Sequence, residues 1–186
     1  MKKWISFGQV MALVKSHLIM GFLSSMLGIF LFISIVSNEV GNMIFTVIFT
    51  LIYFMSIYGA ASNCAARDKK TFTEQKPYPW KGLILPVGIL LATALLWGLY
   101  KIAWTFITID GVLATFSGVA CSMIFTIWTF MFNAFMGIQS GAINGYAVII
   151  LIVVPVAASG LGYYMGYRGF DIYDKLMRLV YEKKKQ

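Results

Sequence analysis

Long, nearly uncharged apolar stretches recur along most of this 186-residue sequence. A stretch of about 20 such residues is enough to cross roughly 30 Å of hydrocarbon as a helix. Hydrophobic residues make up 60% of the chain and charged residues only 12%, whereas a soluble globular domain carries about 25% charged residues. The sequence therefore predicts an all-α integral membrane helical bundle that forms a single domain, residues 1–186.

Four stretches are predicted to be full transmembrane helices: residues 18–37, 43–61, 82–104 and 146–167. A further stretch, residues 111–137, is also long enough to span the bilayer. We expect it to be either a re-entrant segment or a fifth transmembrane helix.

The distribution of basic residues favours four crossings over five. Four crossings place fourteen of the fifteen Lys and Arg residues on one side of the membrane and leave only Lys101 on the other. Five crossings divide the same residues eight to seven. Cytoplasmic loops are enriched in Lys and Arg, so we expect both termini in the cytoplasm and residues 111–137 to be re-entrant from the outer side.

Three polar segments are expected on the cytoplasmic side. Residues 1–17 and the tail, residues 171–186, have the pattern of amphipathic interfacial helices that contact anionic lipid headgroups. An equally open alternative makes residues 1–17 a plain extension of the first span. Residues 63–81 are expected to form a cytoplasmic loop whose charged group is Arg67, Asp68, Lys69 and Lys70. No fold motif of a nucleic-acid-binding protein accompanies these cations, so we expect no nucleic-acid partner.

Small residues recur at a spacing of four on several predicted helices. Such faces let helix backbones approach closely in a membrane. The candidates are Gly21 and Gly28 in the first span and Ala158, Gly162 and Gly166 in the last. The favoured interpretation is that these residues pack the protein's own helices together. The alternative is that one face, best that of Ala158 to Gly166, binds a membrane protein partner or a second copy of the chain.

Residues able to support catalysis or metal binding are few. His17 is the only histidine and is expected at the membrane interface in a structural role. Cys64 and Cys121 belong to no Cys/His cluster, and no phosphate-binding loop motif is present. The sequence thus predicts no catalytic residue, no cofactor and no metal site.

A group of polar residues flanks the ambiguous fifth stretch. Asp110, Asn133, Gln139 and Asn144 would lie on the outer side if that stretch is re-entrant. Irregular backbone at membrane depth is tolerated where it lines a cavity. We therefore expect these four residues to be candidates for a polar outer cavity.

Several short motifs near the helix ends carry a resemblance. They are Arg67-Asp68, Lys81-Gly82 with Pro86, and Pro155 followed by Gly160-Leu161-Gly162-Tyr163 and Gly166-Tyr167. With these motifs the chain resembles small uncharacterised bacterial membrane proteins of similar length. The resemblance implies a bacterial cytoplasmic membrane and no particular activity.

Two functions from different classes fit these features. The first is a non-enzymatic subunit or accessory component of a membrane complex, because packing faces are many and chemically active residues few. The alternative is a small carrier or substrate-binding component of a transporter, with its ligand near the polar outer residues.

Overall fold

The computed structural model describes residues 5–31, 38–70, 77–107, 112–136 and 145–170, and this part of the chain contains helices and no strand. The all-α prediction is confirmed. In chain order the elements are α1 (Phe7–Leu31), α2 (Glu39–Asp68), the 3-10 helix η2 (Pro79–Leu83), α3 (Val87–Ile107), α4 (Val112–Thr129), the 3-10 helix η3 (Phe130–Phe132), α5 (Asn133–Met136) and α6 (Gly145–Arg168).

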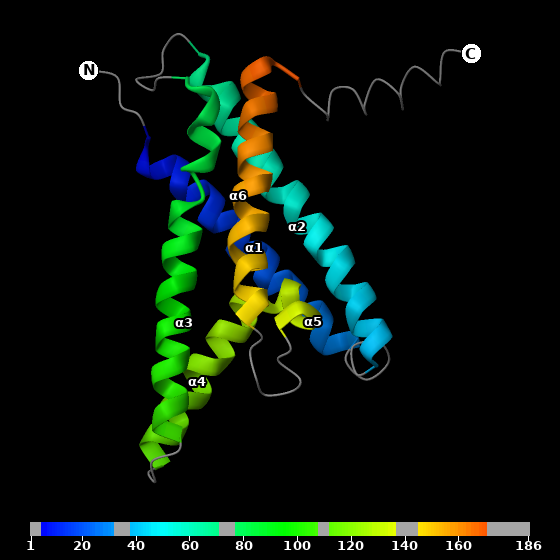
Figure 1. The fold of residues 1–186 in the computed structure, drawn as a ribbon, viewed down its shortest axis with the longest axis vertical. Helices are drawn as coiled ribbons and strands as arrows, with labels where there is room; N and C mark the ends of the chain where they lie inside the picture. Colours follow the sequence, from blue (N-terminus) through cyan, green and yellow to red (C-terminus); the bar gives the residue numbers. More distant parts are fainter. Residues whose placement is uncertain (1–4, 32–37, 71–76, 108–111, 137–144, 171–186) are drawn as a thin grey trace.

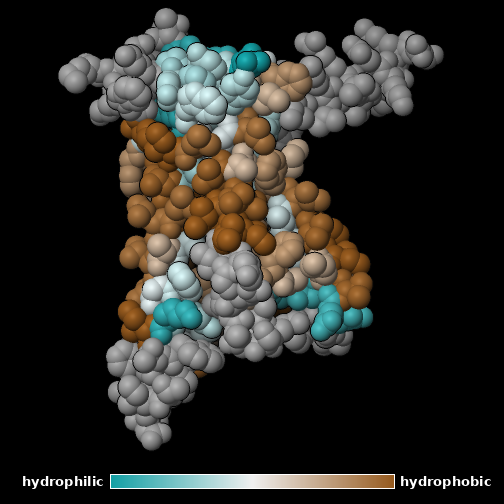
Figure 2. Space-filling model, viewed as in Figure 1, coloured by the Kyte–Doolittle hydropathy of each residue, from teal (hydrophilic) through white to brown (hydrophobic). Residues whose placement is uncertain are grey.

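Five helical segments in the described residues are long and apolar enough to cross a membrane. The surface matches this property, because a broad hydrophobic band separates more hydrophilic ends on the face in Figure 2. Large apolar side chains on the outer faces are exposed, among them Phe22, Ile44, Leu51 and Leu95. The expectation of an integral membrane protein is therefore supported by both length and surface.

Two helices extend beyond their predicted bounds. Helix α1 is unbroken at residue 18, where the sequence separated an interfacial helix from the first span. Helix α2 continues through residues 63–68, which were predicted as loop. Alanine is the strongest helix former, and the last turns of α2 contain Ala60, Ala61, Ala65 and Ala66. The predicted tail helix, residues 171–186, lies outside the described residues.

Polar contacts and glycine contacts give the directions of the helices (Figure 1). Gln9 and His17 of α1 contact Asp68 and Tyr53 of α2, respectively, so these helices are antiparallel. Gly162 and Gly166 of α6 lie against Tyr58 and Ser62 of α2, and both numbers rise together. Helices α2 and α6 therefore run in the same direction.

The chain reverses its direction between α4 and α5. Helix α4 runs antiparallel to α3, since Trp128 hydrogen-bonds to Thr93 and Phe125 stacks on Tyr100. It ends at Thr129, whose φ of −109° and ψ of 3° are not helical. The following residues then descend beside the first half of α2: Thr50 donates to the Met131 carbonyl, and Ala134 N–H donates to Thr46. Figure 1 shows α5 near the end of the bundle at which α2 and α6 begin.

Candidate functional site

Small residues join α6 to α2 along a close interface, which we call the α2–α6 seam. A Cβ atom added at Gly162 would overlap the Tyr58 carbonyl oxygen, and one at Gly166 would lie 2.7 Å from the Ser62 carbonyl oxygen. Ala158 is fully buried one turn earlier. Glycine alone fits such distances, so Gly162 and Gly166 pack α6 against α2, and Ala158 is buried in the same helix.

The other two candidate packing residues also face inward. A Cβ atom at Gly21 would lie 2.8 Å from the carbonyl oxygen of Ile127 in α4, and one at Gly28 would overlap the Phe130 ring in η3. These glycines let α1 approach the point where the chain reverses. All five predicted packing residues are thus buried inside the bundle.

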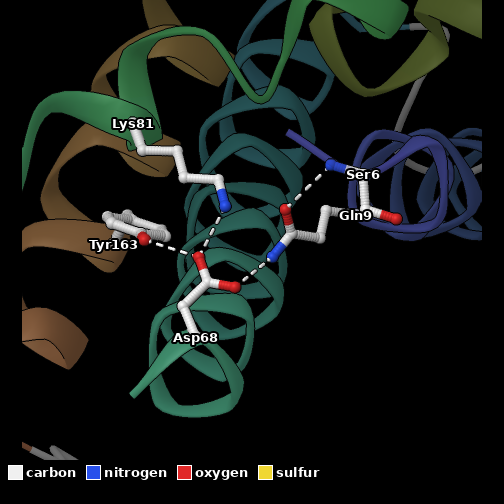
Figure 3. A network of polar contacts seen from close by, with 5 residues as sticks. All are labelled: Ser6, Gln9, Asp68, Lys81 and Tyr163. Atoms are coloured by element: carbon white, nitrogen blue, oxygen red, sulfur yellow. Dashed lines mark hydrogen bonds and ion pairs between the residues drawn. The ribbon is translucent and has the colours of Figure 1, made fainter. Parts of the chain in front are cut away.

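A buried charged cluster closes the end of the bundle at which α1 begins and α2 and α6 end (Figure 3). We call this the basic end. Asp68 Oδ2 accepts from Lys81 Nζ and from the Tyr163 hydroxyl, each at 2.6 Å. Asp68 Oδ1 accepts from Gln9 Nε2, also at 2.6 Å. One carboxylate therefore joins α1, α2, η2 and α6.

The cluster can stay buried because its charges are paired and hydrogen-bonded. The Lys81 and Asp68 side chains expose only 2% and 1% of their surface. Two opposite charges removed from water are tolerated when geometry is good and the remaining lone pairs are satisfied. Gln9 is itself held, because its Oε1 accepts from the Ser6 backbone N–H at 3.3 Å. The arrangement fixes four elements in one geometry.

Sequence reasoning placed Asp68 in a solvated loop and missed this cluster. A signal was present, because Ile57, Ala61, Ala65 and Asp68 follow one another at helical spacing on one face. Extending the predicted helix by two turns puts the carboxylate on the buried face. Of the predicted charged group, Arg67, Lys69 and Lys70 are exposed, and Lys69 Nζ lies 5.5 Å from the Tyr167 ring centroid.

A second polar group lies deep inside the bundle around His17. Its Nδ1 is 2.9 Å from the Tyr53 hydroxyl, and its ring centroid is 4.1 Å from that of Trp128. The expectation of an interfacial histidine was wrong: α1 begins at Phe7, so His17 lies about 15 Å along the helix and is 1% exposed. Within the described residues, its Nε2 has no hydrogen-bond partner.

Of the four residues predicted to line a polar outer cavity, one, Asn133, lies in the described part of the chain. Asn133 in α5 is buried and donates to Asn42 Oδ1 in α2 at 3.2 Å. Its amide therefore holds the reversed segment against α2. Asp110, Gln139 and Asn144 lie outside the described residues.

A cavity of about 380 Å³ separates α3 from α6. Leu90, Ala94 and Trp97 form its α3 wall, Phe125 and Met136 its base, and Leu151 its α6 wall. Its rim residues Leu91 and Ile152 are exposed, so the cavity opens on the apolar outer surface. We call it the α3–α6 cavity.

The walls of the α3–α6 cavity are almost entirely carbon. Its one hydroxyl, on Thr93, donates to the Ile89 carbonyl and accepts from Trp128 Nε1, each at 2.8 Å. The Trp97 Nε1 is buried and lacks a hydrogen-bond partner among the described residues. Apolar cavities of this kind bind apolar molecules, because water there would lack the polar partners it needs.

The described part of the chain holds no group of three His, Cys, Asp or Glu residues arranged for a metal ion. Cys64 is a buried free thiol and Cys121 a half-buried one. No family model matches the sequence, and no curated protein and no solved structure matches the chain.

Proposed function

We propose that this protein is a non-enzymatic integral membrane component that takes the hydrocarbon part of a lipophilic molecule from the bilayer into the α3–α6 cavity. It would act as a small carrier or as the substrate-binding component of a transporter. The observation that carries the proposal is the cavity itself, which has carbon walls and an exposed apolar rim. A molecule that comes from the bilayer gains no hydrophobic transfer energy there, so van der Waals packing against the cavity walls would hold it.

The bundle suits this role because α6 is firmly held by α2 away from the cavity. The α2–α6 seam and the buried cluster around Asp68 fix α6 along one side. The cavity borders the first turns of α6, at Leu151 and Ile152, whereas the seam lies about 15 Å further along the helix at Gly162 and Gly166. A hydrocarbon chain could therefore enter from the bilayer without separating the seam. A ligand that is mainly hydrocarbon needs few polar contacts, which agrees with the walls.

The topology that we infer has four crossings, formed by α1, α2, η2 with α3, and α6. The segment from α4 to α5 would enter from the outer side and return to it. Helices α2 and α6 run in the same direction, so the chain between them must cross the membrane an odd number of times. A single crossing by α3 satisfies this condition, whereas crossings by both α3 and α4 would not. The reversal after Thr129 supports it independently. The basic end then faces the cytoplasm of a bacterial cell, with both termini on that side.

A second candidate function, a subunit of a membrane complex, is favoured by one face of α3. Ala94 is exposed there, and a Cβ atom at Gly98 would meet no atom within 4 Å. Two small residues four apart suit close packing with another helix. A partner helix on this face would also cover the mouth of the α3–α6 cavity.

Saturable labelling by a photoactivatable lipid tests the first candidate. The protein in nanodiscs is irradiated with a trace of phospholipid that carries a diazirine in one acyl chain. Labelled residues are then identified by mass spectrometry. We expect labelling at Leu91 and Ile152 to saturate and to be competed away by phospholipid without the diazirine. Labelling at Leu51, on the outer face of α2, should fall only in proportion to the dilution of the diazirine lipid.

Two matched variants sharpen this test. Ala94→Trp fills the cavity and should abolish the saturable component, whereas Leu95→Trp adds a ring to the exposed neighbouring position and should leave it unchanged. Equal, unsaturable labelling at all three positions would remove the carrier proposal. Copurification of a membrane protein that is lost in Gly98→Leu, with no saturable labelling, would favour the subunit instead.

A further inference from the structure

A second groove of about 380 Å³ lies at the basic end between η2 and α6. Trp80 and Leu83 form its η2 wall, and Gly160, Leu161 and Tyr164 form its α6 wall. Trp80 is 59% exposed and Leu161 is 51% exposed, so the groove opens outward. Leu161 and Tyr164 lie nine and twelve residues beyond Ile152, or about 14 and 18 Å further along α6, which separates the groove from the α3–α6 cavity.

The groove combines apolar walls with an aromatic and cationic rim. Tryptophan and tyrosine side chains concentrate at the headgroup level of membranes. Arg168 lies over the Tyr164 ring, with its Cζ 4.7 Å from the ring centroid. This arrangement holds a guanidinium group at the upper edge of the groove, one helical turn beyond its lining residue.

The charge around the groove is positive. Arg67, Lys69, Lys70 and Arg168 are exposed in the described residues near this end. The one described carboxylate there, Asp68, is buried with Lys81 and Tyr163 and so does not offset those cations at the surface. An anionic headgroup is therefore the complementary ligand, and arginine pairs well with phosphate.

We propose that the groove between η2 and α6 binds one anionic phospholipid, with an acyl chain against Leu83 and Leu161 and the phosphate at Arg168. Trp80 would lie at the level of the glycerol backbone. This site is distinct from the α3–α6 cavity and does not depend on what that cavity binds. It would anchor the basic end to anionic lipid at a fixed position on α6.

Native mass spectrometry of the full chain tests this site. The protein is released from micelles containing equal amounts of phosphatidylglycerol and phosphatidylcholine, and retained lipids are counted. We expect one phosphatidylglycerol to be retained in preference. Arg168→Gln should weaken that retention about fivefold, the effect of about 1 kcal/mol for one cation near a membrane surface. Arg67→Gln removes the same charge from α2, which contributes no lining residue to the groove, and should change retention less.

A steric variant separates the groove from general surface charge. Ala157→Phe places a ring in the groove and should abolish the preferred lipid while Arg168 remains. A melting temperature close to that of the parent protein shows that the variant is folded. Equal retention of the two lipids by the parent protein, or equal losses in Arg168→Gln and Arg67→Gln, would overturn the proposal.

Discussion

Helix α6 meets two neighbours in opposite ways. On the α2 side, Gly162 and Gly166 bring the backbones so close that no Cβ atom fits between them. Nearer the start of α6, Leu151 and Ile152 border a cavity of about 380 Å³ next to α3. In a membrane, helices associate by close packing and interhelical hydrogen bonds, because lipid is as apolar as the side chains. The α2–α6 seam has both kinds of contact. The walls of the α3–α6 cavity are not in contact with each other, and this is where we propose that a hydrocarbon chain binds.

The largest effect is expected from breaking the cluster that ends the seam. Asp68→Leu leaves the Lys81 ammonium buried without its carboxylate, and losing one partner of a buried ion pair costs about 3–5 kcal/mol. Reversible unfolding in mixed micelles measures the loss. Asp68→Leu combined with Lys81→Met should recover much of it, because no charge is then left buried. Failure to recover would show that the cluster acts through Tyr163 and Gln9 rather than through the ion pair.

Within the seam, Gly162→Leu should lower the free energy of unfolding by about 3 kcal/mol, since a large side chain forces the two backbones apart. Gly98→Leu is its matched control, because a side chain there meets open space. The same unfolding assay compares the two variants. Equal losses would mean that the seam is not packed as described.

Filling the cavity should have the opposite sign. Ala94→Leu adds apolar atoms to the cavity wall and should raise the free energy of unfolding by about 1 kcal/mol, as cavity-filling changes commonly do. Ala158→Leu makes the same change at a fully buried position of α6 and should destabilise. A loss in Ala94→Leu comparable to that in Ala158→Leu would remove the distinction between the α3–α6 cavity and the closely packed part of α6.

The smallest effect is expected at Trp97. Its indole N–H has no hydrogen-bond partner among the described residues, so Trp97→Phe should change the free energy of unfolding by a few tenths of a kcal/mol beyond the loss of ring area. Trp128→Phe removes the bond to Thr93 and should cost about 1 kcal/mol more. Thermal unfolding of both variants provides the comparison. Equal costs would indicate that Trp97 has a partner, such as a bound lipid.

Local sequence signals predicted the helices well and their partners poorly. Apolar runs gave the helical segments, although α2 begins at Glu39, with Asn38 as its N-cap, four residues before the predicted start of that span. The small residues of α6 also pointed to close packing. These features depend on neighbours in sequence, so composition and spacing reveal them.

The candidate sites depend on contacts between distant residues. Asp68 meets Tyr163 across 95 positions and Lys81 across 13, and no local pattern states which cation pairs with which carboxylate. The α3–α6 cavity is likewise a property of how two helices are spaced, since its walls consist of ordinary leucines and alanines. His17 was misplaced because a predicted boundary at residue 18 cut through a continuous helix.

The direction of α6 beside α2 underlies the seam, the cavity and the inferred four crossings, and crosslinking of paired cysteines measures it directly. Ser62→Cys with Tyr167→Cys, in a background of Cys64→Ala and Cys121→Ala, should be joined in membranes by a short bifunctional thiol reagent, because Ser62 contacts Gly166, the residue before Tyr167. Ser62→Cys with Ala147→Cys, near the other end of α6, should not be joined. Crosslinking of the second pair and not of the first would mean that α6 runs antiparallel to α2, and would contradict the account.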